Sequence, residues 1–187
     1  MKKTALKLFL ALCVSVVAHS QEKLDIDIQK STIKWIGEYT FYFGGHDGFI
    51  QFEKGHFTKT GDVITGGEFV IDMNSITNTD IDKKDANQGL VEHLKDPDFF
   101  DVKNYPKAKL VLTKVEYSDS THARIEGDLT LKGVTKPINF RAEFVYKEKE
   151  MKTRFKIDRR AWNVNYTSKL KDGAISDAIG LEVSIKL

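Results

Sequence analysis

The sequence has 187 residues, of which 41% are hydrophobic and 30% charged, with three Pro and one Cys. This composition excludes collagenous, low-complexity and disulfide-stapled proteins, and the length fits one ordinary globular domain. The formal net charge of +2 comes from three lysines in the first twenty residues, without which 26 bases face 27 acids, so the charge indicates neither nucleic acid nor another anionic partner.

Residues 1–20 have the three parts of a secretory signal peptide. They start with basic residues, continue with an apolar run and end with small residues at Ala18 and Ser20. The run is shorter than the ~20 residues that span a bilayer. We therefore expect cleavage near Ser20/Gln21, a periplasmic or secreted protein, and a mature chain (21–187) that forms a single domain with no integral membrane segment.

Cys13 lies inside the apolar run. Leu12 precedes it, whereas a lipid-modified bacterial cysteine normally follows a small residue, so we do not expect lipidation. If cleavage follows Ser20, the mature chain has no Cys. Disulfides, thiolate nucleophiles and cysteine metal sites are then excluded.

Three β-rich runs make up the first half of the mature chain. They cover 33–43, 48–58 and 63–73, and glycine-containing turns separate them. Further strands are expected at 108–117 and 151–158. These runs indicate that β-structure dominates the domain.

One segment between these strands has a helical pattern. Within 82–95, Leu90, Val91 and Leu94 recur at helical spacing, and Pro97 ends the run. We expect one short helix there. Because two aromatic rings follow it, we also expect the helix and the loop with Phe99 and Phe100 to pack against the sheet, with at least one ring buried.

Three later segments alternate between apolar and polar residues with a period of two, as in strands with one buried and one exposed face. They are 121–133, 138–147 and 179–187. A parallel sheet buried on both faces would read as continuous apolar runs, so we expect antiparallel strands. Eight or more strands in one domain predict an all-β barrel or sandwich.

No sequence motif indicates catalysis, a metal or a cofactor. His46, His56, His93 and His122 are isolated, without HxH, HExxH or CxxC spacing, and nucleotide and serine-esterase motifs are absent. The histidines are interpreted as surface or capping residues, with the alternative that His46 or His93 lines the mouth of a site. Acidic residues near the helix lack the glutamate and glycine of a calcium loop.

The aromatic content, with twelve Phe, six Tyr and two Trp, leaves two interpretations open. In a sandwich the rings fill the core. In a closed eight-stranded barrel the same apolar faces can surround a hollow wide enough for one small ligand. Periodicity does not separate these two alternatives.

Five segments together resemble the YceI-like family of secreted bacterial proteins. They are GGEFVIDMNSI (66–76), HLKDPDFFDVKNYPKAKL (93–110), GDLTLKGVTKPI (127–138), FKIDRRAWNV (155–164) and ISDAIGLEVSIKL (175–187). The resemblance implies a lipocalin-like antiparallel eight-stranded barrel that binds a polyisoprenoid or another long-chain lipid, with no catalytic residues to transfer. Asn163, where many relatives have Gly, and the short loop 167–174 depart from the family pattern at the barrel mouth.

The expected ligand is a long apolar small molecule, isoprenoid or fatty-acid-like, and inward alternation predicts the residues that line its site. They are Trp35, Phe43, Ile50, Phe52, Phe69, Ile71, Met73, Phe99, Phe100, Leu110, Leu112, Ala123, Ile125, Leu129, Phe140, Ala142, Phe144, Phe155, Ile157, Trp162, Leu181 and Val183. The small side chains of Ala123 and Ala142 are expected to leave room for the ligand.

Two other functions remain open. One is a filled-core β protein that acts as an envelope stress or assembly factor through surface contacts. The other is an enzyme with a lipid substrate, which is disfavoured because the sequence shows no paired nucleophile and base.

Overall fold

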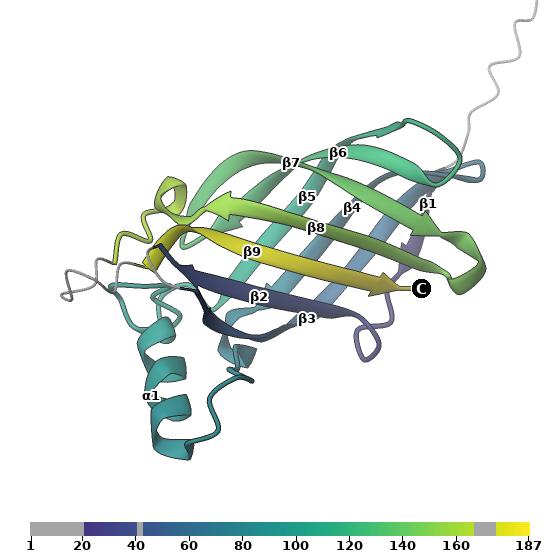
Figure 1. The fold of residues 1–187 in the computed structure, drawn as a ribbon. Helices are drawn as coiled ribbons and strands as arrows, with labels where there is room; N and C mark the ends of the chain where they lie inside the picture. Colours follow the sequence, from purple (N-terminus) through teal and green to yellow (C-terminus); the bar gives the residue numbers. More distant parts are fainter. Residues whose placement is uncertain (1–20, 41–42, 167–174) are drawn as a thin grey trace, which may run out of the picture.

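The computed structural model describes residues 21–40, 43–166 and 175–187 (Figure 1). Its strands are β1 (Gln21–Asp25), β2 (Thr32–Tyr39), β3 (Gly45–Thr60), β4 (Val63–Asp72), β5 (Lys107–Tyr117), β6 (His122–Leu131), β7 (Val134–Val145), β8 (Glu150–Asp158) and β9 (Ile175–Lys186). The helix α1 spans Lys84–Lys95, and short 3-10 turns are η1 (Met73–Ser75), η2 (Tyr146–Glu148) and η3 (Arg159–Trp162).

Eight of these strands form a closed antiparallel barrel. Their order around the barrel is β2-β9-β8-β7-β6-β5-β4-β3, and β3 pairs with β2 to close it. The long strand β3 pairs with β2 over Gly45–Ile50 and with β1 over His56–Thr60. β1 therefore pairs with the part of β3 that lies beyond its pairing with β2. The predicted eight-stranded all-β barrel with one helix is confirmed.

The two ends of the barrel differ in what lies beside them (Figure 1). We call the end beside α1 the helix end; Tyr39 of β2, Gly45 of β3 and Ile175 of β9 lie there. The opposite end, which we call the far end, carries β1 and the last residues of β5 and β9, Tyr117 and Lys186.

The segment after α1 covers part of the helix end. Leu94 of α1 is buried, and the rings of Phe99 and Phe100 are 5% and 7% exposed, which confirms that this loop packs against the barrel. Lys132, in the β6–β7 turn, fixes it because its Nζ donates to the carbonyl oxygens of Pro97 and Phe99, each at 2.8 Å.

Strand boundaries differ from the predictions in several places, among them the starts of β3 at Gly45 and β7 at Val134, three and four residues earlier than predicted. β1 was not predicted, because QEKLD lacks clear alternation and forms a strand only by pairing with β3. β2 ends at Tyr39 instead of Phe43, and β9 begins at Ile175, four residues earlier than predicted. The expected signal peptide with Cys13, and the loop 167–174, lie outside the described residues. In the part of the chain that is described, no helix is long and apolar enough to cross a membrane.

Candidate functional site

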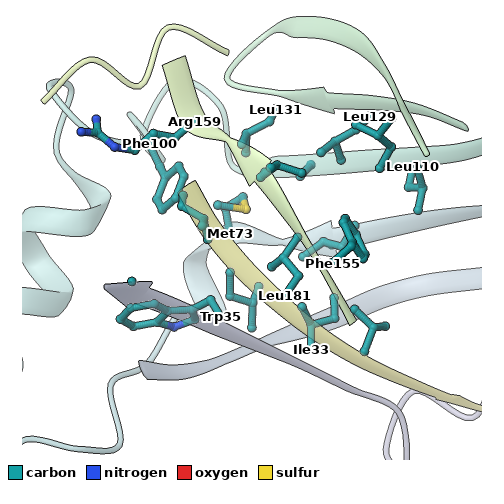
Figure 2. A pocket seen from close by; sticks show the side chains of 18 of the residues that line it. Ile33, Trp35, Met73, Phe100, Leu110, Leu129, Leu131, Phe155, Arg159 and Leu181 are labelled. Atoms are coloured by element: carbon teal, nitrogen blue, oxygen red, sulfur yellow. The ribbon is translucent and has the colours of Figure 1, made fainter. Parts of the chain in front are cut away.

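The barrel encloses an apolar cavity of about 300 Å³ that reaches the helix end. Figure 2 shows side chains from different strands pointing toward this space, among them Trp35 from β2, Leu110 from β5, Phe155 from β8 and Leu181 from β9. Met73 of η1 and Phe100 of the loop after α1 add to the wall at the helix end. The cavity is therefore built by residues that are distant in sequence.

Inward-facing side chains keep accessible surface around the middle of the barrel. Ile71, Leu110, Ile138, Phe155 and Leu181 lie on inward positions, yet each is only partly buried. In a packed interior such residues would be fully covered, because protein cores leave few voids larger than a water molecule. The partial exposure of these residues is consistent with a hollow.

Toward the far end, aromatic rings of β3, β4 and β7 fill part of the interior, although Ile33, Met151 and Ile185 still line the cavity. Phe57 and Phe144 are at most 4% exposed, and their ring centroids lie 6.2 Å apart. Phe69, whose centroid lies 5.1 Å from that of Phe57, also lines the cavity and marks the boundary. Tyr117 packs on Phe144 at 5.5 Å. These rings, with the fully buried Ile125, close the barrel below the cavity.

Sixteen of the twenty-two residues predicted to line the site do line the cavity. They are Trp35, Ile50, Phe52, Phe69, Ile71, Met73, Phe99, Phe100, Leu110, Leu112, Leu129, Phe140, Phe155, Ile157, Leu181 and Val183. Thirteen of them lie on strands, where residues two apart share the inner face of a barrel, whereas Met73, Phe99 and Phe100 come from η1 and the loop after α1.

Four predicted residues belong to the filled far end: Ala123, Ile125, Ala142 and Phe144. The prediction that two alanines leave room for a ligand is wrong at this position. Ala123 pairs with Ala142 on β7 and with Tyr117 on β5. Rings from these and neighbouring strands take up the space that the small side chains leave.

The other two exceptions lie outside the cavity wall. Phe43 follows the end of β2, where its side chain is fully exposed instead of facing inward. Trp162 of η3 is buried, and its Nε1 donates to the Leu129 carbonyl oxygen at 2.9 Å, so it supports the helix end structurally without lining the cavity.

Polar side chains line the cavity mainly at the helix end, and three residues form a hydrogen-bonded row there. The hydroxyl of Tyr39 lies 2.9 Å from Nε2 of His46, and Nδ1 of His46 lies 2.8 Å from Oδ2 of Asp80. Tyr39 and His46 line the cavity, whereas Asp80 lies behind them. The row is a phenol–imidazole–carboxylate chain that no sequence motif indicated.

The backbone of β3 allows Asp80 to approach His46. A side chain at Gly48 would place its Cβ 1.9 Å from the Thr77 carbonyl oxygen, so only glycine lets the segment 77–80 lie against the strand. Thr77 and Thr79 then donate their backbone N–H groups to β3, to the carbonyl oxygens of Phe49 and Asp47, each at 2.9 Å. Gly48 is thus a requirement for the geometry of the row.

The Asp80 carboxylate is held in its ionised form. Burial acts to raise the pKa of Asp80, but hydrogen bonds from the Asp47 backbone N–H, from His46 and from the Asn78 side chain outweigh it and lower the pKa below its usual range. Asp80 therefore accepts hydrogen bonds and donates none.

Both charged side chains that line the cavity have partners of opposite charge. Arg159 is buried; its Nη2 lies 3.1 Å from Oδ1 of Asp177, and its Nε and Nη1 donate to the carbonyl oxygens of Ser176 and Val164. Glu38 pairs with Lys156 at 2.7 Å. The described lining of the cavity therefore holds no unpaired Lys, Arg, Asp or Glu.

His93 of α1 lines the same end and contacts the rings of Phe99 and Tyr166, with centroids 5.9 and 4.5 Å away. Its Nδ1 lies 3.9 Å from Asp98, and Asp96 is also close. The alternative that His46 or His93 lines a site mouth thus holds for both. Asp96 and Asp98 are exposed and do not line the cavity.

Sequence reasoning missed further wall residues. They include Ile33, Leu90, Leu94, Ala108, Leu131, Ile138, Met151, Ile179 and Ile185, along with the polar Tyr39 and Arg159. Strand alternation could have indicated most of the apolar ones. No sequence pattern indicated Tyr39 and Arg159, because they lie at the end of β2 and in the 3-10 turn η3, where strand periodicity does not apply.

Comparisons with known proteins agree with this architecture. The YceI-like domain matches residues 23–187. A UPF0312 protein of Pseudomonas putida (strain W619) is 32% identical over 199 residues, covering 100% of this chain and 97% of the relative, and one from strain GB-1 is 31% identical with the same coverage.

A solved structure shows the same fold. The crystal structure of Burkholderia cenocepacia BcnA superposes with a TM-score of 0.70 at 18% identity, covering 86% of this chain and 98% of BcnA. The match of the domain over nearly the whole described chain, the full-length relatives and the eight-stranded barrel lead to one conclusion: this chain belongs to the YceI-like family.

Proposed function

We propose that the protein binds the apolar chain of a polyisoprenoid or another long-chain lipid inside the barrel and carries it without reacting with it. The observation that supports this proposal is the apolar cavity of about 300 Å³. A water molecule takes about 30 Å³ of liquid and a methylene group is of similar size, so about ten carbons fit inside. A longer chain extends through the helix end.

Burial of the chain supplies the affinity. Moving about ten methylene groups out of water contributes about 8 kcal/mol before the costs of association are subtracted. The walls need no charged anchor for this, and leucine, isoleucine and phenylalanine side chains are the surface that an extended hydrocarbon prefers. Since we expect residues 1–20 to act as a signal peptide, we propose that this carrier acts in the periplasm or outside the cell.

The surface-acting alternative depends on a filled interior. The far end fulfils that condition, but the helix end does not, because inward-facing residues such as Leu110 and Leu181 stay partly exposed around the hollow. The lipid-carrier proposal uses this feature of the barrel, whereas the alternative leaves it without a role.

Mass spectrometry of organic extracts from the purified protein tests the proposal. We expect about one lipid per protein, with its mass unchanged by prolonged incubation. A protein that stays empty after exposure to total lipid extracts of its host would contradict the proposal and favour the surface-acting alternative.

A pair of variants in β9 connects the lipid to the cavity. Leu181 faces the hollow and Glu182, the next residue, faces outward, where it pairs with Arg154. Leu181→Trp should fill the hollow and lower the lipid-to-protein ratio by at least about twofold, whereas Glu182→Trp should keep the wild-type ratio. Equal ratios in both variants would mean that the lipid binds elsewhere.

A further inference from the structure

One side of α1 forms part of the cavity wall. Leu90, His93 and Leu94 line the cavity, and Leu94 is the one buried residue of this fully described helix. The rest of α1 stands away from the strands (Figure 1). Because buried apolar contacts hold a short helix in place, α1 is fixed mainly through its C-terminal end.

The C-terminal end of α1 is anchored in three ways. Leu94 belongs to the apolar cluster that includes Phe99 and Phe100. The Nζ of Lys95 donates to the Asn74 carbonyl oxygen at 2.8 Å, and Lys132 holds the loop that follows the helix. This end therefore stays on the barrel when other parts of the helix move.

The first turns of α1 have no comparable apolar anchor. Residues 84–86 and Gln88 are exposed, and an open groove of about 540 Å³ lies between these turns and the segment 76–82. Gly89 comes next, and a Cβ at this position would meet no neighbouring atom within 4 Å. Glycine weakens the interior of a helix, so Gly89 is a weak point between the exposed turns and the anchored end.

A pair of side chains, Asn78 and Asn87, ties the first turns to the barrel, and we call this pair the latch. The Nδ2 of Asn87 lies 3.1 Å from both the carbonyl oxygen and Oδ1 of Asn78, and 3.0 Å from the Ile81 carbonyl oxygen. Asn78 is buried, and its own Nδ2 donates to the Asp47 carbonyl oxygen and to the Asp80 carboxylate. The latch thus consists of hydrogen bonds, which contribute little net free energy because water replaces them when they open.

We propose that α1 is the gate of the cavity: when the latch opens, the first turns swing about Gly89, Leu90 leaves the cavity wall, and an apolar chain passes between α1 and the segment 76–82. Opening exchanges a few hydrogen bonds with water, while the anchored end keeps the helix on the barrel. This inference rests on the proposed function, because a gate needs a ligand that enters the cavity. It adds the route of that ligand and the element that sets the rate of its entry and release.

Stopped-flow fluorescence with cis-parinaric acid, a fluorescent polyene with a long apolar chain, measures these rates. Asn87→Ala removes the latch and should make both association and release about three- to tenfold faster, with the Kd changed by less than about twofold. Gln88→Ala is the matched control, because the Gln88 side chain bonds to Glu92 of the same helix, and it should keep both wild-type rates. Gly89→Ala fits the open space around this residue and stiffens the helix, so both rates should become slower.

A reversible lock tests the same motion within one variant. Asn78→Cys and Asn87→Cys are combined, and the two thiols are joined by a short bis(methanethiosulfonate) cross-linker that a reductant removes. The mature chain that we expect has no other Cys to react. The cross-linked form should take up cis-parinaric acid at least about tenfold more slowly than the reduced form.

The outcomes separate this inference from the proposed function. Uptake that is equally fast in the cross-linked and reduced forms, or wild-type rates in Asn87→Ala, would overturn the gate and leave the lipid-carrier proposal intact. A weaker equilibrium affinity of Asn87→Ala at an unchanged association rate would show that this residue supports the bound state, and would also overturn the gate. If the wild type does not bind cis-parinaric acid at all, the lipid-carrier proposal fails, and the gate fails with it.

Discussion

The two ends of the same barrel differ in how their side chains fill the interior. At the far end, the rings of Phe57, Phe144 and Tyr117 pack together and fill the interior. From the middle of the barrel to the helix end, residues such as Leu110 and Leu181 line an open space of about 300 Å³. The difference shows that a closed barrel does not by itself make a cavity; the way in which side chains from different strands pack in each layer decides.

This division separates stability from binding. A filled core contributes its full burial and packing energy, whereas residues around a hollow have neighbours on only one side. Substitutions at the far end should therefore change the free energy of unfolding, and substitutions at the cavity should change ligand content.

The largest effect is expected at the centre of the far end. Phe57 is 1% exposed and packs on two other rings, so Phe57→Ala should lower the free energy of unfolding by about 3–5 kcal/mol. Urea titration followed by circular dichroism measures this. Phe49→Ala, on the same strand at 41% exposure, is the control and should change it by less than about 1 kcal/mol. Similar losses for both would mean that the far end is not packed as described.

Overpacking is the second test of the far end. Ala142 is 3% exposed and surrounded by a filled core, so Ala142→Phe should cost about 1–3 kcal/mol or more and leave bound lipid per folded molecule unchanged. Unfolding midpoints measure the predicted loss of stability, and lipid extraction from the same sample measures the predicted lipid content. A stable variant that has lost its lipid would place the tunnel at Ala142 after all.

The far end also holds a buried carboxylate, which gives it a pH dependence. Burial acts to raise the pKa of Glu150, but bonds from Lys186, Ser184 and Lys152 outweigh it and lower the pKa to about 2. A lowered folded-state pKa contributes stability above the ordinary value of 4.5, and this contribution is lost as the pH falls from there to about 2.

Glu150→Gln should therefore lower the free energy of unfolding by about 1 kcal/mol at pH 6 and by less at pH 2. The measurement is the difference in unfolding midpoint between variant and wild type at each pH, which cancels the other titrating groups. A difference that stays constant across this range would show that the Glu150 charge makes no contribution.

The smallest change in stability is expected at the cavity. Leu181→Trp places a larger side chain where the barrel is hollow, so the free energy of unfolding should change by no more than about 1 kcal/mol, even though lipid content falls. The same urea titration, on delipidated wild type and variant, measures it. A loss as large as that of Ala142→Phe would mean that both ends are equally packed.

The sequence alone determined the eight strands of the barrel, the helix and nearly half of the residues of the cavity wall. Period-two alternation assigned the inner face of β6 and β9, and helical spacing placed α1, because both patterns are local consequences of backbone geometry. Ala123 and Ala142 were also correctly assigned to the inside. They do not line the cavity, because the packing of side chains from other strands fills the space beside them.

Tertiary structure decided where the interior is hollow and what stands at its mouth. Whether an inward alanine leaves a void depends on rings such as Tyr117 and Phe144, which reach it from other strands. In the same way Tyr39, His46 and Asp80 meet only because barrel closure and the close approach at Gly48 bring residues up to 41 positions apart into one row. Alternation predicts which face of the sheet a side chain takes. The empty volume beside that side chain, and the residues that it contacts, depend on the strands that closure of the barrel brings next to it.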